Sequence, residues 1–318
     1  MQFTENISLL SYFFVSSFAF GCIVGSFLNV VVWRLPRGES LCHPPSHCPR
    51  CGHMIRAWEN IPILSWLVLR RRCSACHLPI SWHYPAGEAA VGLLYAGIFW
   101  HLLRGGLPLA VLPGYFWLAG AVLSAARIDA EKYIIPNKIT YSGMLAAFLL
   151  ALVFPKGRLI LHRESLQATN GLFFQEVLEK LNHWEPLAGF LQHSSAAAAL
   201  DCVLGMLIGG SMLALFAVAG KLLCYKQKRE SEAVGYGDVK FLAMIGAFLG
   251  ADAAVYILLG GAMLGFLFGL IKWARKKNIE NIFSSLPFAP FLAVPVLFWL
   301  LVGNWFYLFW HFFYDKMQ

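Results

Sequence analysis

The chain has 318 residues, of which 58% are hydrophobic and only 13% are charged. A soluble globular protein has about 25% charged residues, so this composition excludes an ordinary soluble fold. The net charge of +8 indicates membrane topology and affinity for anionic lipid. It does not indicate nucleic-acid binding, because no basic helix or aromatic platform stands clear of the apolar segments.

Long apolar segments recur along the chain and predict an all-α, polytopic membrane helix bundle of about eight transmembrane helices. The first segment is too long for the apolar core of a signal peptide and follows no basic region, so we expect a retained membrane helix. The predicted spans are residues 9–33, 85–103, 107–126, 139–154, 197–220, 239–250, 253–271 and 287–312. The span 239–250 covers only about 18 Å of a hydrocarbon core of about 30 Å. Either this helix begins earlier and places Asp238 below the surface, or it lines a water-accessible cavity.

Basic residues in the connectors orient these spans. Four connectors on one side of an eight-helix chain carry seven, three, four and four Lys and Arg residues: 34–83, 127–138, 221–238 and 272–285. The positive-inside rule places this side in the cytoplasm and both termini outside. Asp129 and Asp238 then both lie on the cytoplasmic side of the membrane.

The connectors also divide the chain into four expected parts. Residues 1–33 form the first membrane helix, and residues 34–83 form a cytoplasmic zinc-binding loop. Residues 84–126 form the next two membrane helices. Residues 127–318 form a second membrane region with an outer-face insertion at 155–196. An amphipathic piece at residues 174–181 of that insertion is expected to lie on the membrane or against helix ends.

Four cysteines form two CxxC motifs in the first loop, Cys48 with Cys51 and Cys73 with Cys76, separated by 21 residues. Four thiolates at this spacing can close a tetrahedral zinc site, and a shell of four thiolates leaves no open position for catalysis. A cytoplasmic loop disfavours disulfides because that compartment is reducing. We therefore predict a structural zinc ion bound by the four cysteines.

Other residues of the same loop could support this site. Gly52 permits the tight turn that points backbone amides at sulfur. Histidines also crowd the loop and are possible substitute ligands, although each taken singly is more typical of a solvated or interfacial residue. These histidines are His43, His47, His53, His77 and His83.

Asp129 and Asp238 lie at the ends of apolar segments, where a carboxylate is costly and indicates function. A lone aspartate near Arg127 and Lys132, as Asp129 is, would more often be a surface salt-bridge partner. The residues before Asp238 favour the functional interpretation over the salt-bridge interpretation for the two aspartates together.

Gly235 and Gly237 flank Tyr236 immediately before Asp238. Glycines at these positions let the backbone approach another helix or an extended peptide, which a merely solvated aspartate does not need. Lys240 is expected to be a cytoplasmic anchor or to tune the nearby carboxylate.

A pair of carboxylates that share one proton can hydrolyse an amide. The ionised member takes a proton from water while the protonated member donates to the carbonyl oxygen, and the two roles reverse as the amine leaves. This chemistry suits a substrate that is itself in the membrane.

Six segments of the chain together resemble the bacterial type IV prepilin peptidases, membrane aspartyl proteases of the GxGD class. The resemblance covers most of the chain. Its motifs are residues 25–30 with 34–36, the double CxxC loop, residues 84–88, the segment from Asp129 to Asn137, residues 235–240, and residues 286–292.

The resemblance implies that Asp129 and Asp238 are catalytic. It implies cleavage of a basic leader from type IV prepilins or type II secretion pseudopilins. It also implies N-methylation of the new N-terminus with S-adenosylmethionine, because the cysteine-bearing region accompanies bifunctional members. Asn29 and Glu88 are possible participants, with helix packing and polar capping as the alternative.

This chain departs from the family pattern at a few places. The long segment 155–196 is not a family hallmark. Ala130 and Glu131 stand where many members carry a further aspartate, and Ala289 stands where glycine is common. No glycine-rich nucleotide loop follows a strand, so the methyl-donor site has no independent signal.

Three alternatives remain open from the residues alone. The enzyme could be a peptidase only, with a structural zinc loop. The chain could be a transporter that uses the aspartates as a proton relay, although such proteins carry charges near helix midpoints or paired broken helices. It could also be a zinc-stapled assembly scaffold with no activity.

Overall fold

The computed structural model describes residues 2–104, 109–155, 194–226, 235–276 and 287–303. In these ranges the regular structure is helical, apart from two isolated β-bridges, which confirms the all-α prediction. Residues 156–193 of the predicted insertion at 155–196, including the amphipathic piece at 174–181, lie outside the described residues. The chain forms two compact units, Met1–His101 and Leu102–Gln318.

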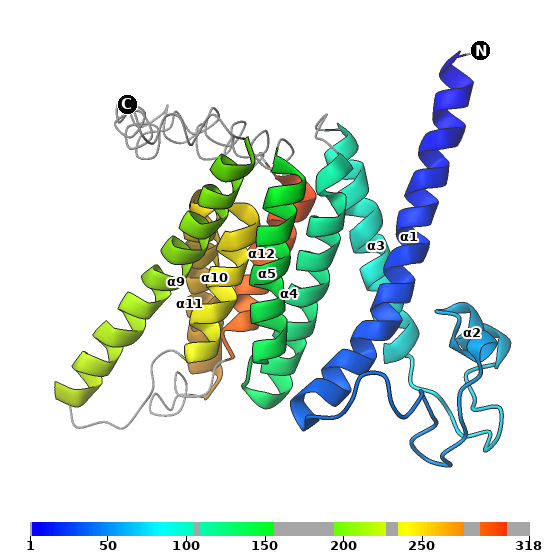
Figure 1. The fold of residues 1–318 in the computed structure, drawn as a ribbon. Helices are drawn as coiled ribbons and strands as arrows, with labels where there is room; N and C mark the ends of the chain where they lie inside the picture. The colour runs from blue at the N-terminus through cyan, green and yellow to red at the C-terminus, as the bar shows by residue number, and fades with distance from the viewer. Residues whose placement is uncertain (1, 105–108, 156–193, 227–234, 277–286, 304–318) are drawn as a thin grey trace. The chain divides into compact units, whose positions relative to one another are not determined.

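The first unit contains two long helices, α1 (Gln2–Arg34) and α3 (His83–Arg104), joined by a loop with short helical turns. Helices α1 and α3 lie side by side (Figure 1). Small residues form their contact: a Cβ atom on Gly21 would lie 2.8 Å from the Cα atom of Gly92, and one on Gly25 would lie 2.9 Å from the Cα atom of Glu88. Small residues allow this approach because no side chain separates the two backbones.

The second unit is a helical bundle. Its long helices are α4 (Leu112–Lys132), α5 (Asn137–Val153), α9 (Ser194–Lys226), α10 (Tyr236–Leu249), α11 (Ala251–Lys276) and α12 (Ala289–Val302). Helix α10 contacts each of the other five and packs most extensively against α9. Its middle turns are buried, including Phe241, Leu242 and Ile245. The short helix α10 is therefore the centre of this unit.

Five helical segments of the described chain are long and apolar enough to cross a membrane: Leu10–Arg37, His83–Arg104, Leu109–Lys132, Ser195–Ala219 and Ala251–Lys272. Helices α5 and α12 are apolar but shorter. Each of the eight predicted spans corresponds to a helix of the structure, although residues 304–312 of the last one lie outside the described part.

Two helix boundaries differ from the prediction, and both bear on the aspartates. Helix α4 continues past residue 126 to Lys132, so Asp129 lies on its last turns and not in a connector. The helix ends at Tyr133, whose left-handed backbone (φ 57°) lets its N–H donate to the carbonyl oxygen of Asp129. Helix α10 begins at Tyr236, which is the first of the two alternatives considered for the short span, and Asp238 lies on its first turn.

Candidate functional site

Asp129 is buried near the end of α4, with only 5% of its surface exposed. Its Oδ2 atom accepts a hydrogen bond of 3.0 Å from the backbone N–H of Ala289, the first residue of α12. A helix N-terminus presents free N–H groups and a positive dipole end, so it stabilises a negative charge beside it. Helix α12 therefore binds and orients this carboxylate.

Asp129 is not a surface salt-bridge partner of Arg127, because Asp129 is buried and Arg127 pairs with another acid. Arg127 pairs with Glu131 one turn along the same helix at 3.5 Å, and both side chains are about half exposed. Ala130 is exposed as well. Ala130 and Glu131, two of the positions at which this chain departs from the family pattern, thus lie on the exposed side of α4, away from the buried side that carries Asp129.

Asp238 is half-buried on the first turn of α10 and lies within electrostatic range of Asp129, so ionisation of one carboxyl group opposes ionisation of the other. Gly235 is the N-cap residue of this helix, and its carbonyl oxygen accepts a 3.2 Å hydrogen bond from the Asp238 N–H. A Cβ atom at Gly235 would lie 3.4 Å from Asp238 Oδ2. Asp129 and Asp238 thus come from two elements far apart in the sequence, α4 and α10, which contact each other.

Gly237 makes the close approach for which the sequence analysis required a glycine. A Cβ atom there would lie 3.2 Å from the Cβ atom of Ile135, tighter than most real contacts. Ile135 belongs to the connector between α4 and α5. The close neighbour is therefore this connector and not a second helix.

Lys240 connects the first turn of α10 to the start of α5. Its Nζ atom donates to Asn137 Oδ1 at 2.9 Å and lies 5.3 Å from the ring centroid of Tyr141. A cation over an aromatic ring is attracted by the ring's negative face. These contacts place Lys240 as a positioning residue for the turn that carries Asp238.

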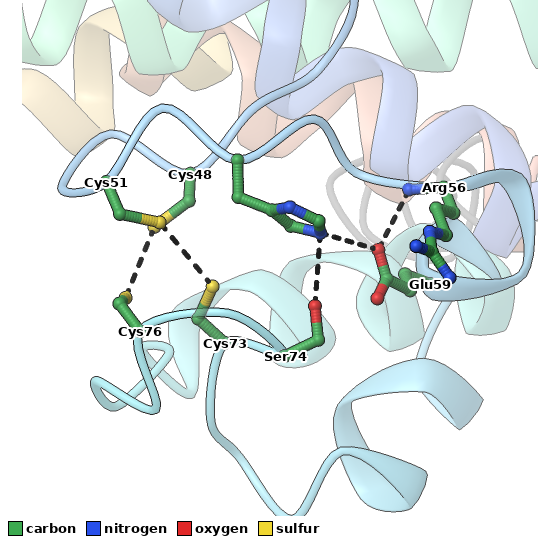
Figure 2. Close-up of polar contacts among 8 residues, drawn as sticks. Cys48, Cys51, Arg56, Glu59, Cys73, Ser74 and Cys76 are labelled. Atoms are coloured by element: carbon green, nitrogen blue, oxygen red, sulfur yellow. Dashed lines mark hydrogen bonds and ion pairs between the residues drawn. The ribbon is translucent and has the colours of Figure 1, made fainter.

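The four predicted cysteines of the first unit also come together. The sulfur atoms of Cys48, Cys51, Cys73 and Cys76 all lie within 4.8 Å of one another (Figure 2), and two of the pairs lie at 4.0 Å. A tetrahedral zinc ion with bonds of about 2.3 Å separates its sulfur ligands by about 3.8 Å, so this donor set fits zinc. Among the described residues this group contains only cysteines, so none of the candidate histidines contributes a ligand atom.

Each CxxC motif forms the same backbone turn. The N–H of Cys48 donates to the carbonyl oxygen of His53, and the N–H of Cys73 donates to that of Leu78. Gly52 and His77 occupy equivalent positions, and both have positive φ values, of 72° and 56°. The sequence analysis identified the glycine but not the histidine, because a histidine carries no comparable signal for this conformation.

Backbone amides favour the thiolate form within these turns. Hydrogen bonds from the N–H groups of Arg50 and Cys51 lower the pKa of the Cys48 thiol. Those of Cys76 and Ala75 lower the pKa of the Cys73 thiol in the same way. Since the thiolate is the metal-binding form, the turns prepare these two sulfur atoms for a cation.

A polar network joins the two motifs beside the sulfur cluster (Figure 2). His53 Nε2 lies 3.2 Å from Ser74 Oγ and 3.5 Å from Glu59 Oε2. The backbone N–H of Arg56 donates to Glu59 Oε2 at 2.9 Å, and this bond lowers the pKa of the buried Glu59 carboxyl. This network is a second link between the two cysteine motifs, in addition to the contacts among their sulfur atoms.

Glu88 has a structural contact that the sequence did not reveal. It is buried on α3 and accepts a 2.8 Å hydrogen bond from the backbone N–H of Ile63 in the loop. Asn29 lies nearby on α1, with its Oδ1 atom 3.7 Å from where a Cβ atom of Gly87 would be. Both residues therefore contribute to the packing of α1, α3 and the loop.

Comparisons with known proteins match most of the chain. Residues 19–102 match the bacterial peptidase A24 N-terminal domain, and residues 116–270 match the type IV leader peptidase family. A prepilin leader peptidase/N-methyltransferase of Burkholderia pseudomallei is 33% identical, over 91% of this chain and 85% of that protein. Proteins of the same name from Pseudomonas putida and Pseudomonas aeruginosa are each 31% identical, over 92% of this chain and 92% and 91% of theirs.

The chain belongs to the type IV leader peptidase family. The match to the N-terminal family domain ends at residue 102, one residue after the end of the first structural unit, and it contains the cysteine cluster and Glu88. The peptidase domain contains Asp129 and Asp238 but ends before α12 and its residue Ala289. No solved structure matches the chain significantly.

Proposed function

We propose that this chain cleaves the leader peptide of a type IV prepilin or pseudopilin with Asp129 and Asp238, and then N-methylates the new N-terminus. The observation that carries the proposal is the buried Asp129, bound by the start of α12 and within electrostatic range of Asp238. Both acids lie in the region that matches the type IV leader peptidase family. Relatives over nine-tenths of the chain are named for the peptidase and the methyltransferase together.

In the proposed mechanism Asp129 is the ionised member of the pair, because the Ala289 N–H stabilises its charged form. It takes a proton from a water molecule, whose oxygen attacks the carbonyl carbon of the scissile bond. Protonated Asp238 donates its proton to the carbonyl oxygen. The resulting diol then collapses and the C–N bond breaks. The proton now on Asp129 passes to the leaving amine, and ionised Asp238 takes back a proton from one of the diol hydroxyl groups as the carbonyl re-forms, so both acids return to their starting states.

The proposed orientation places the dyad at the cytoplasmic face of the inner membrane. It rests on about eight transmembrane helices whose basic connectors, including the zinc loop, lie in the cytoplasm. Helix α10 has 14 residues and is therefore about 21 Å long, shorter than the hydrocarbon core. A short helix with Asp238 on its first turn suits a substrate whose own helix lies in the bilayer and whose leader emerges into water.

For the first unit we propose a zinc ion bound by Cys48, Cys51, Cys73 and Cys76. A bound zinc would cross-link the two motifs as a closed four-thiolate site. The methylation step would use S-adenosylmethionine as the methyl donor. The support for that step is the name of the relatives and the match to their N-terminal domain.

The test is cleavage and methylation of a purified prepilin by the enzyme in nanodiscs. Asp129→Asn and Asp238→Asn should each lower the cleavage rate by at least about 10²-fold, the lower range for loss of acid–base catalysis. Both variants should still methylate a peptide that already has the mature N-terminus. Glu131→Gln is the matched control, since Glu131 is an exposed acid on the same turn of α4.

Wild-type cleavage by either aspartate variant would overturn the dyad. The mass of the mature pilin N-terminus tests the second activity separately. A product without the added methyl group, in the presence of S-adenosylmethionine, would leave a peptidase only.

A further inference from the structure

An apolar face of the cysteine-bearing loop has no partner among the described residues of the first unit. The short helix α2 (Leu64–Val68) presents Leu64, Leu67 and Val68, which are 60%, 56% and 72% exposed. These residues are spaced i, i+3 and i+4, so they share one side of the helix. Three large aliphatic side chains on one exposed face indicate a surface that is covered in the working protein.

The other side of α2 is bound to the second cysteine motif. Trp66 donates from Nε1 to the carbonyl oxygen of Ile80 at 3.2 Å, and the guanidinium of Arg71 lies 5.0 Å from the centroid of the Trp66 ring. The N–H of Ile80 in turn donates to the carbonyl oxygen of Arg71 at 2.7 Å. These contacts hold the Trp66 side of α2 against the segment around Ile80. The side that carries Leu64, Leu67 and Val68 therefore faces away from the loop.

A contact with α3 sets the position of the exposed apolar face of α2 along the length of α3. The N–H of Ile63, immediately before α2, donates to Glu88, which lies about 7.5 Å along α3 from its first residue. Figure 1 accordingly shows α2 beside the first turns of α3 rather than beyond its end. Helix α3 is long and apolar enough to cross a membrane. If it does so, the start of α2 would lie at the depth where α3 enters the bilayer.

The residues after α2 carry the complementary charge. Arg70, Arg71 and Arg72 follow directly and are all exposed. The whole connector 34–83 has seven arginines against two glutamates. Exposed Trp82 and Tyr84 stand at the start of α3, as aromatic residues do where a span meets the headgroups. An apolar face beside a cationic run, at interfacial depth, matches an anionic lipid surface.

We propose that residues 64–72 form an interfacial anchor that holds the cysteine-bearing loop on the anionic leaflet of the membrane. The aliphatic side chains enter the acyl region, and the arginines bind the phosphate groups of acidic lipids. The Glu88–Ile63 hydrogen bond sets the depth. This role depends only on α1 and α3 crossing the membrane, so it is independent of the proposed peptidase and methyltransferase activities.

The experiment places a fluorescent non-natural amino acid at Val68 in the full chain, reconstituted in nanodiscs of phosphatidylcholine and phosphatidylglycerol. The discs are made with and without bromine on the acyl chains, since bromine quenches a fluorophore that enters them. Leu78 is the matched control site, because it is also an exposed aliphatic residue but belongs to the second cysteine motif. Leu64 provides a second labelling position on the same face of α2.

Brominated lipid should quench the fluorophore at Val68 and Leu64 but not at Leu78. Replacing Arg70, Arg71 and Arg72 by Gln should weaken the partition of this segment by roughly 10²-fold at low ionic strength, and salt should act in the same direction. Omission of phosphatidylglycerol should likewise reduce the quenching.

Equal quenching at Val68 and Leu78, or none at either site, would overturn the anchor. If the quenching did not change with salt, with lipid charge or with the arginine substitutions, the proposed attraction between the arginines and anionic lipid would be wrong, and the anchor with it. Displacement of the lipid contact by added prepilin would assign the face to substrate and also overturn it.

Discussion

A methyl group at Gly246 provides a direct test of how the bundle positions Asp238. A Cβ atom there would lie 2.8 Å from the carbonyl carbon of Gly205 on α9, and that residue's carbonyl oxygen is closer still. Non-bonded carbon atoms prefer about 3.5–4.0 Å, so α9 and α10 would have to separate locally by about 0.7–1.2 Å. Overpacking of this kind costs about 1–3 kcal/mol of stability.

We expect the same displacement to shift the first turn of α10, which carries the proposed catalytic residue Asp238. Asp238 lies eight residues before Gly246, about 12 Å along α10. A displacement of about 1 Å at a catalytic group can lower a rate by about 10²-fold. Gly246→Ala should therefore slow leader cleavage by up to that factor, measured as gel-resolved processing of prepilin by enzyme in nanodiscs. Thermal unfolding of the same preparation should show the loss of stability.

Gly265→Ala on α11 is the control. A Cβ atom there would meet Phe291 at 3.7 Å, which is an ordinary contact. Alanine also favours a helix over glycine by about 1 kcal/mol, so this variant should be as stable as wild type or more so, and equally active. If Gly246→Ala matched Gly265→Ala in both rate and melting temperature, close packing of α9 and α10 could not be what positions Asp238.

Three further changes test separate contacts. Glu59→Gln should speed zinc release to a chelator by roughly tenfold, because it weakens the network beside the cysteines, whereas exposed Glu39→Gln should not. Lys240→Met should lower kcat by roughly tenfold with little change in KM, since the lost bond to Asn137 positions a catalytic turn and does not bind substrate. A clear fall in the melting temperature of Lys240→Met would instead show that Lys240 stabilises the fold in general and does not specifically position Asp238. Tyr133→Gly should raise stability by roughly 1 kcal/mol, because glycine adopts the left-handed end of α4 without a Cβ clash, and an unchanged melting temperature would contradict this.

Local patterns in the sequence predicted the parts of the fold that depend on local composition. Apolar runs identified each of the long helices that the structure describes, because a membrane helix satisfies its own backbone and needs an apolar surface. The CxxC spacing identified the four sulfur atoms that lie within 4.8 Å of one another, since two turns and one metal set that spacing. The start of α10 at Tyr236 was not identified in this way: the predicted span began at residue 239, and an earlier start was one of two alternatives.

Contacts between distant residues were not predictable in this way. The end of α4 was placed too early because Arg127, Glu131 and Lys132 are polar, yet a helix continues through polar residues where its side faces water. Ala289 donates to Asp129 with a backbone N–H, which every residue except proline possesses. The sequence analysis identified the motif at residues 286–292, but it could not predict that Ala289 of this motif binds Asp129, which lies 160 positions earlier in the chain.

That contact also has a consequence for the order in which the enzyme is made. A chain emerging from the ribosome inserts α4 and α10 well before α12, so both acids are in the membrane while the amide that orients Asp129 is still being synthesised. If the two acids cleave the leader as proposed, a chain that ends before α12 would hold Asp129 without the N–H group that orients it. We expect such a chain to be less active than the whole protein.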